Sequence, residues 1–266
     1  MSIVVDTPVV NDSVIVEAEG AIGTMTLNRP DALNAFNREL MEDIIAATRW
    51  FNDRPEVKVV VVRGSGSSFC AGFDLQYFSS LASPEAVRDV VALGRPLADA
   101  VARMRATTIA SVHGHCVGGG VVLAAACDFR YASADALFHL PETALGIPLA
   151  WGGIPWLVRE MGPLRAAEFV LLCERLSAQR VESLGLLNAV LGSKDQLDEH
   201  VSRIADTLAQ RSRLVLETTK QQIHAAREEL AANHYSFCDA HILHSAFTDE
   251  ESSECRSSYL AALAKR

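Results

Sequence analysis

The 266-residue sequence has no excess of positive charge, no paired cysteines and no long apolar run. Its 24 basic and 33 acidic residues give a formal net charge of −9, which argues against a nucleic-acid-binding or membrane-surface protein. The six cysteines include no CxxC pair, so neither a disulfide framework nor a structural zinc site is expected. Because no run approaches eighteen apolar residues and the first residues are not basic, we expect a cytoplasmic protein.

Common cofactor and nucleophile motifs are also missing. The stretch GSGSSF at 64–69 has Phe69 where the third glycine of a GxGxxG dinucleotide fingerprint would stand. No P-loop sequence and no GxSxG nucleophile elbow occur. His113 and His115 have no carboxylate or third histidine nearby, which argues against a metal site. We therefore expect no metal and no bound cofactor.

The first half of the chain alternates strand and helix patterns. VIVEAEG and AIGTMTLNRP, residues 14–30, alternate apolar and polar side chains around Glu19 and Gly20, which predicts a hairpin. Apolar residues recur at helical spacing over 37–51, and β-branched or apolar runs at 57–64 and 107–114 are typical of strands covered on both faces. This alternation favours an α/β fold with a mainly parallel sheet layered with helices.

Strand patterns end near residue 200. The apolar positions from Val215 to Leu230 predict a helix instead. We therefore expect an α/β core over 1–200 and a helical C-terminal region over 201–266.

Two glycine-bearing loops each follow a predicted buried strand. They read SGSSFCAGFD at 65–74 and HGHCVGGG at 113–120. The carboxyl ends of neighbouring parallel strands lie at one edge of a sheet, so both loops are able to direct backbone N–H groups at one point. That arrangement would form an oxyanion hole. The alternative is that the glycines serve only tight turns and close packing.

Four stretches in order resemble one family. NRPDALNAF at 28–36, FCAGFDL at 69–75, HGHCVGGGVVLAAACD at 113–128 and LPETALGIPLAWGG at 140–153 resemble the crotonase, or enoyl-CoA hydratase/isomerase, superfamily. The resemblance runs across residues 10–200. It implies a spiral of ββα units, an acyl-CoA thioester as the substrate in fatty-acid or related metabolism, and C-terminal helices that help form homotrimers, often paired as hexamers.

The resemblance assigns roles to individual residues. The two oxyanion N–H groups fall on Phe73 and Gly119, with the positive end of a helix dipole beside Gly119, and the catalytic carboxylate falls on Glu142. The residues that we expect to bind CoA or the acyl group are Ala32, Leu33, Ala71, Gly72, Asp74, Leu75, Gly118, Val122, Leu145 and Trp151. Among these, we expect Asp74 to fix the loop that presents Phe73.

One carboxylate of the hydratase pattern is missing. Hydratases of the family use two glutamates, because water must be activated while a proton reaches the neighbouring carbon. The first of these positions holds Val122, which leaves Glu142 alone. A single carboxylate resembles the Δ3,Δ2-enoyl-CoA isomerases, in which one base moves a proton from C2 to C4. Ala150 stands where the dehalogenase and dienoyl-isomerase branches carry an aspartate, which disfavours both.

Burial of Glu142 is expected to matter for this chemistry. Apolar neighbours at Leu145, Ile147 and Trp151 should raise the pKa of the carboxyl group by desolvation. The alternative is an exposed glutamate on a loop.

Two other functions stay open from the sequence. One is hydration of a 2-enoyl-CoA, with the water held by groups outside the linear motifs. The other is a family member that binds acyl-CoA without catalysis, because Asp31 and Gln76 replace lysines that often meet the CoA phosphates. Candidates for phosphate contact are Arg29, Lys265 and Arg266.

Three further side chains near these motifs could have either a structural or a catalytic role. His139 is either a second acid–base group or a hydrogen-bonded histidine at a strand end. Cys70 and Cys116 are either reactive thiols or small buried residues, and the second reading is favoured.

Overall fold

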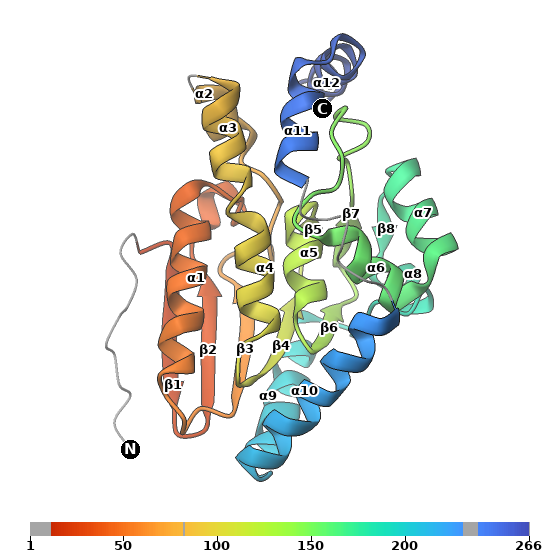
Figure 1. Ribbon diagram of the computed structural model, residues 1–266. Helices are drawn as coiled ribbons and strands as arrows, with labels where there is room; N and C mark the ends of the chain where they lie inside the picture. Colours follow the sequence, from red (N-terminus) through yellow and green to blue (C-terminus); the bar gives the residue numbers. More distant parts are fainter. Residues whose placement is uncertain (1–11, 82, 231–238, 266) are drawn as a thin grey trace.

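A computed structural model describes residues 12–81, 83–230 and 239–265 of the chain. The strands divide between two sheets (Figure 1). They are β1 (Val14–Glu19), β2 (Ile22–Leu27), β3 (Val59–Gly64), β4 (Thr107–Val112), β5 (His115–Val117), β6 (Phe129–Ser133), β7 (Leu137–His139), β8 (Leu176–Ser177) and β9 (Ala189–Leu191).

The larger sheet has the strand order β1-β2-β3-β4-β6-β9. β1 and β2 form an antiparallel hairpin, and Gly20 in its turn has a φ of +59°, which favours glycine. The other neighbours in this sheet are parallel. A smaller sheet, β5-β7-β8, begins directly after β4. The predicted hairpin and the mainly parallel sheet are therefore confirmed.

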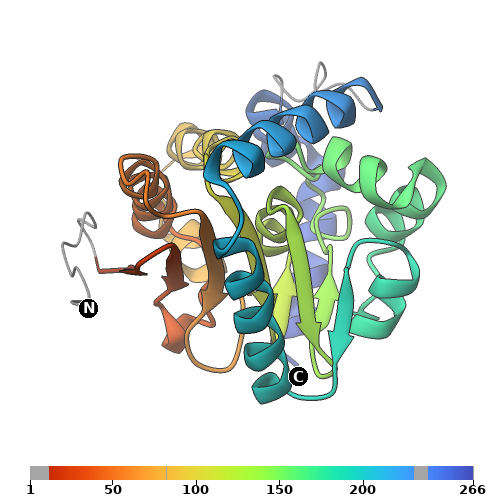
Figure 2. The ribbon, with the colours of Figure 1, turned by 90° about the horizontal axis from the view of Figure 1, so that it is seen from below.

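Helices cover both faces of the larger sheet and extend beyond one end of it (Figures 1 and 2). Besides the short 3-10 helix η1 (Pro30–Ala32), they are α1 (Arg38–Asn52), α2 (Leu75–Ser80), α3 (Pro84–Val91), α4 (Gly94–Ala102), α5 (Gly119–Ala126), α6 (Gly153–Met161), α7 (Pro163–Leu172), α8 (Ala178–Ser183), α9 (Lys194–Ala209), α10 (Arg213–Leu230), α11 (Asp239–Thr248) and α12 (Glu250–Leu263).

Strand β3 shows how the two faces are filled. Val60 and Val62 belong to the main core with α1, α4 and α5, whereas Val59 and Val61 belong to a second cluster with apolar side chains of α9. Successive side chains of a strand point to opposite faces, so a continuous valine run needs cover on both sides. The prediction of a doubly covered strand is confirmed.

The start of α1 follows from its sequence. The side chain of Asn37 caps the helix by accepting a hydrogen bond from the N–H of Leu40 at 2.9 Å. Leu40, Ile44, Ala47 and Phe51 then repeat at helical spacing and are all buried. The predicted helix over 37–51 is confirmed, with its ends shifted by one residue.

The last helices include both sheet-bound and outlying elements. α9 packs on the sheet and contains residue 200, so the expected division at that residue falls inside a helix. α10 is tied to the core by an ion pair of 2.7 Å between Lys220 and Asp128. α11 packs against α3, and both lie at the end of the larger sheet where α2 and α12 also lie (Figure 1). The division into two regions and the homotrimer stay predictions.

Candidate active site

The two glycine-bearing loops lie side by side beyond β3 and β4. The N–H of Phe69 donates to the carbonyl of His113 at 2.8 Å, and that of Cys70 donates to His115 at 2.9 Å. In return, the N–H of Val117 donates to the carbonyl of Cys70 at 2.9 Å. The predicted convergence of the loops at one edge of the sheet is confirmed.

A third segment, which precedes α1, lies on the other side of the first loop. The N–H of Ala71 donates to the carbonyl of Leu33 at 3.0 Å. The N–H of Phe36 then donates to Gly72 at 2.7 Å, and the N–H of Asp74 donates to Phe36 at 3.0 Å. Residues 70–73 are therefore held between two neighbouring segments of main chain.

This pairing fixes where the N–H of Phe73 points. Consecutive peptide groups of an extended segment point to alternate sides, and the groups on either side of Phe73 face Phe36. The N–H of Phe73 therefore points away from Phe36. Within the described residues, neither this N–H nor that of Gly119 donates a hydrogen bond to a protein carbonyl. Both N–H groups are free to donate a hydrogen bond to a ligand oxygen.

Each of the three consecutive glycines stands where a side chain would collide. A methyl group on Gly118, whose φ is +52°, would lie 2.5 Å from Oε1 of Glu142. One on Gly119 would lie 2.4 Å from the ring of Trp151. One on Gly120 would lie 2.7 Å from a backbone oxygen of the first loop. The glycines therefore let the main chain lie directly against the carboxylate and the first loop. Helix α5 begins here, so the positive end of its dipole lies at the same place.

Glu142 is buried, and its carboxyl group faces the second loop. Its exposed fraction is 8%, and burial raises the pKa of the carboxyl from 4.5 to about 7. Its Oε2 has no hydrogen-bond partner among the described residues. The turn that carries it is closed by a hydrogen bond of 3.0 Å from the N–H of Ile147 to the carbonyl of Glu142. The alternative of an exposed loop glutamate is wrong, and the expected rise in pKa is confirmed.

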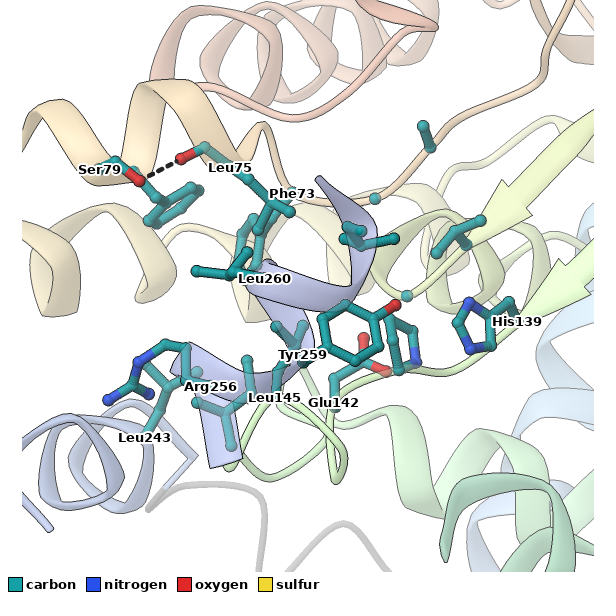
Figure 3. A pocket seen from close by; sticks show the side chains of 18 of the residues that line it. Phe73, Leu75, Ser79, His139, Glu142, Leu145, Leu243, Arg256, Tyr259 and Leu260 are labelled. Atoms are coloured by element: carbon teal, nitrogen blue, oxygen red, sulfur yellow. Dashed lines mark hydrogen bonds between the residues drawn. The ribbon is translucent and has the colours of Figure 1, made fainter. Parts of the chain in front are cut away.

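A cavity of about 470 Å³ opens beside this carboxylate (Figure 3). Seven of the predicted residues line it: Ala71, Gly72, Phe73, Leu75, Gly118, Glu142 and Leu145. Glu142 is the one carboxylate among the described residues that line the cavity. The volume is in the range of small-molecule sites.

A much smaller niche of about 10 Å³ adjoins Glu142 and Phe73. Gly119, Val122 and Trp151 also line it. Val122 is 1% exposed, and its Cγ2 lies 2.9 Å from the point that a methyl group on Gly153 would occupy. A volume of this size holds at most about one water molecule. Its remaining lining consists of apolar residues, so beyond Glu142 and backbone groups little is present to orient a water.

Three predicted binding residues lie at neither cavity within the described part of the chain: Ala32, Leu33 and Asp74. Asp74 caps α2 by accepting the N–H of Tyr77 at 3.0 Å, and it forms an ion pair of 2.9 Å with Arg29. Asp74 and Arg29 therefore hold the loop that carries Phe73, as expected for Asp74. Of the candidate phosphate contacts, Arg29 is engaged in this pair, Lys265 is exposed, and Arg266 lies outside the described residues.

The remaining candidate side chains have structural partners or are buried. Nε2 of His139 lies 3.0 Å from the carbonyl of Cys173, and the ring lines the larger cavity. Burial raises the pKa of Cys70 to about 12 and that of Cys116 well above 9, which keeps both thiols protonated. No group of three or more potential metal-ligating side chains occurs among the described residues. In the same part of the chain, no helix is long and apolar enough to cross a membrane.

The sequence predictions missed the wall of the cavity that α11 and α12 supply. Its side chains are Leu243 and Phe247 from α11, and Arg256, Ser257, Tyr259, Leu260 and Leu263 from α12. Figure 3 labels Leu243, Arg256, Tyr259 and Leu260 among them. The sequence signal for this wall was the spacing of its residues, since side chains three and four positions apart lie on one face of a helix. Because α12 mixes polar and apolar residues without a clear apolar stripe, that signal was weak.

The fold and the site together define a class. A spiral α/β fold presents two loops with unpaired N–H donors opposite one buried carboxylate, as acyl-transfer and enolate-forming sites require. Residues 17–264 match the sequence profile described as enoyl-CoA hydratase/isomerase. The chain belongs to this family, the crotonase superfamily, and is an enzyme of that kind.

Individual relatives carry different activities. The chain is 34% identical to a crotonyl-CoA hydratase of Syntrophomonas wolfei over 79% of this chain and 80% of the relative. It is 33% identical to a peroxisomal Δ(3,5)-Δ(2,4)-dienoyl-CoA isomerase of Arabidopsis thaliana, again over 79% and 80%. The crystal structure of an enoyl-CoA hydratase/isomerase from Mycobacterium paratuberculosis is similar with a TM-score of 0.84 and 28% identity, over 92% of this chain and 98% of that one. The family is thereby established, while hydratase and isomerase names both occur among the relatives.

Proposed function

We propose that this enzyme is a single-glutamate Δ3,Δ2-enoyl-CoA isomerase, in which Glu142 carries a proton between two carbons of the acyl chain. The observation that carries the proposal is the lone carboxylate at the cavity. Glu142 stands there without a second acidic side chain among the described lining residues, and Val122 is buried where hydratases of the family carry their other glutamate.

The proposed reaction starts at C2 of a 3-enoyl-CoA. The Glu142 carboxylate removes a proton from C2, the electrons pass into the thioester carbonyl, and the oxygen becomes an enolate. The N–H groups of Phe73 and Gly119 stabilise that negative charge. The same carboxyl group then returns the proton to C4, which leaves a double bond between C2 and C3.

The environment of Glu142 suits both halves of this reaction. A carboxyl with a pKa of about 7 is a stronger base than an exposed glutamate, and its protonated form is populated enough to return the proton near neutral pH. The unpartnered Oε2 has no protein hydrogen bond to break in the described structure. One residue is therefore able to act as base and then as acid.

The oxyanion donors supply the larger part of the stabilisation. In sites of this type, removal of one fixed donor lowers the rate by roughly a hundred- to a thousand-fold. The donors here are main-chain groups, so side-chain substitutions at Phe73 test packing rather than the donor itself. The dipole of α5 adds positive potential at Gly119.

Hydration is the competing activity. It would require a water held and activated next to Glu142, and the niche between Glu142 and Val122 has room for about one water and offers it few polar contacts. A relative named as a crotonyl-CoA hydratase keeps this reaction as an outcome to be tested.

The deciding experiment compares two substrates on the pure protein. We expect turnover of a 3-enoyl-CoA to the conjugated 2-enoyl-CoA, and little hydration when the 2-enoyl-CoA is supplied. Glu142→Gln should lower kcat by roughly a hundredfold or more. Glu56→Gln, at an exposed glutamate that lines neither cavity, is the matched control and should retain turnover.

Three results would contradict the proposal. Faster hydration than isomerisation would make the enzyme a hydratase. Unchanged isomerisation in Glu142→Gln would reject Glu142 as the base. Binding of acyl-CoA without turnover of either substrate would indicate a family member that has lost catalysis.

A further inference from the structure

Arg256 lies in the wall of the larger cavity with an unsatisfied donor. It belongs to α12, and its side chain lines the same cavity as Glu142. Nη1 of its guanidinium is buried and has no hydrogen-bond partner among the described residues. The other terminal nitrogen, Nη2, donates to Oγ of Ser253 at 3.1 Å. The guanidinium is therefore held at Nη2, while its buried Nη1 has no partner among the described residues.

The charge of Arg256 also lacks a counter-ion in the described part of the chain. No carboxylate oxygen there lies within 4.0 Å of the guanidinium, whereas the buried Arg130 is paired with Glu160 at 2.9 Å. Besides Ser253, the guanidinium contacts the ring of Phe247, whose centroid lies 4.3 Å from the guanidinium carbon. Burial without a compensating acid lowers the pKa of Arg256 below 12.5, although the group stays charged at neutral pH.

The surroundings of this cation are mainly apolar. Leu145, Leu243 and Phe247 line the cavity with it, and Figure 3 shows Arg256 and His139 on opposite sides of Glu142. A buried N–H donor on a cation costs free energy when it has lost its water and gained no acceptor. A ligand that carries an anionic group would supply that acceptor.

We infer that the acyl group of the substrate bears a carboxylate at its far end, and that Arg256 pairs with it. The substrate class is then an ω-carboxyacyl-CoA, a monothioester of a dicarboxylic acid, rather than a plain fatty acyl-CoA. The inference rests on the proposed function only in taking this cavity as the acyl pocket. It does not depend on which reaction Glu142 performs.

The phosphates of CoA are the other possible source of negative charge. They are strongly hydrated groups, and a site for them is expected among solvent-exposed cations. Arg175 is a cation of that kind, since it lines the cavity and is exposed. The buried nitrogen of Arg256 and its contact with Phe247 favour a single carboxylate at the end of an apolar chain. Such a carboxylate can accept a charge-assisted hydrogen bond from an N–H of Nη1.

The test measures binding of saturated thioesters, which do not react. Isothermal calorimetry would compare chains of matched length with and without the terminal carboxylate: glutaryl-CoA with pentanoyl-CoA, adipoyl-CoA with hexanoyl-CoA, and suberoyl-CoA with octanoyl-CoA. For the length that fits, we expect the ω-carboxyacyl-CoA to bind about tenfold more tightly, as expected for one charge-assisted hydrogen-bonded pair.

Substitutions assign that preference to a residue. Arg256→Met should bring the ratio of the two dissociation constants close to one, and Arg256→Lys should keep part of the preference because it keeps the charge. Arg175→Met, which removes an exposed arginine from the same cavity, should keep the ratio. Circular dichroism and thermal unfolding of each variant would confirm that the protein remains folded.

Several outcomes would overturn the inference. One is the absence of a preference for the carboxylate at all three lengths. Another is a preference that survives Arg256→Met or disappears in Arg175→Met. A third is that Arg256→Met loses the same affinity for CoA itself and for every thioester, but loses none for 3′-dephospho-CoA. That result would assign Arg256 to the 3′-phosphate of CoA. These binding ratios do not depend on whether Glu142→Gln loses turnover. The proposed reaction and the proposed substrate class can therefore fail separately.

Discussion

Oε1 of Glu142 lies 2.5 Å from the point that a methyl group on Gly118 would occupy. The carboxylate and the second glycine-bearing loop are therefore in direct contact across the site. Gly118 precedes α5, whose first residue supplies one of the two proposed oxyanion donors. The close approach of the Glu142 carboxylate to the loop at 113–120 thus depends on the absence of a side chain at Gly118.

Gly118→Ala should remove activity. The new methyl group must displace the carboxylate or the loop, and the φ of +52° at this position is strained for any residue with a Cβ. We expect kcat/KM for a 3-enoyl-CoA to fall by roughly a hundredfold or more, as for the loss of a positioned oxyanion donor. Steady-state kinetics of the purified variant would measure it.

Gly162→Ala is the control for backbone strain in that experiment. Gly162 has a φ of +79°, but a methyl group there would meet no atom within 4 Å. The variant should lose some stability and keep its kinetics. Similar kinetic losses in both variants would mean that strain, rather than contact with Glu142, explains the effect.

The rate should titrate with Glu142. Because the pKa of the carboxyl is raised to about 7, it is largely protonated below that pH and cannot accept the C2 proton. We expect kcat/KM for isomerisation to rise about tenfold per pH unit below 7 and to level off above it. A profile between pH 5.5 and 8.5 that is flat, or that has its midpoint near 4.5, would be inconsistent with a buried base.

The free energy of unfolding should also depend on the titration of Glu142, but it should fall as the pH rises. The folded-state pKa of Glu142 lies above its ordinary value of 4.5, so between about pH 4.5 and 7 the folded state holds a proton that the unfolded state has lost. This group's contribution to the free energy of unfolding therefore decreases as pH rises through that window and is constant above it. The full change is about 3 kcal/mol.

Glu142→Gln removes this titration. Urea unfolding would measure the free energy of unfolding of both proteins at several values of pH. We expect this free energy to rise in the variant relative to the wild type from pH 5 to 7, and the difference between the two to stay constant at higher pH. Parallel curves for the two proteins over this range would mean that the carboxyl is solvated in the folded state.

Much of the site was predictable because it depends on short local patterns. Buried strands followed by glycine-bearing loops place backbone donors at one sheet edge, and the structure confirms that the loops at 65–74 and 113–120 meet. The absence of a second carboxylate was visible directly at Val122. The burial of Glu142 was expected from its apolar neighbours and is confirmed.

The parts that were not predicted depend on contacts between distant segments. Arg29 and Asp74 are 45 residues apart, and no periodic pattern indicates that they pair. Trp151 has a φ of +63°, which no rule for tryptophan predicts, and its ring reaches both Phe36 and Phe73. Arg256 enters the cavity only because α11 packs on α3 and brings α12 over the site.

The ion pair between Arg29 and Asp74 should support catalysis without touching the substrate. Asp74→Asn keeps a side chain able to cap α2 but loses the charge that pairs with Arg29. We expect kcat/KM to fall by roughly tenfold, because the loop that carries the N–H of Phe73 becomes less fixed. Arg29→Met should have a similar effect.

Arg38→Met is the matched control for that pair. Arg38 forms an ion pair of 3.3 Å with Glu42 on the exposed face of α1, and such surface pairs contribute about 0–1 kcal/mol. Its kinetics should match those of the wild type. If Asp74→Asn also matches the wild type, the loop is held by its main-chain hydrogen bonds alone.

Association should depend on exposed apolar residues of α10. Leu214, Val215, Ile223 and Leu230 are largely exposed there, with Leu230 at 74%. Exposed apolar groups of this extent on one helix are typical of a surface covered by another chain. We expect a trimer or a dimer of trimers in light scattering after size-exclusion chromatography, and a shift toward monomer in the double variant Ile223→Glu, Leu230→Glu. Gln179→Glu, which adds a negative charge at an exposed polar residue of α8, should keep the assembly. A wild-type protein that is monomeric at micromolar concentration would show that α10 is not an interface.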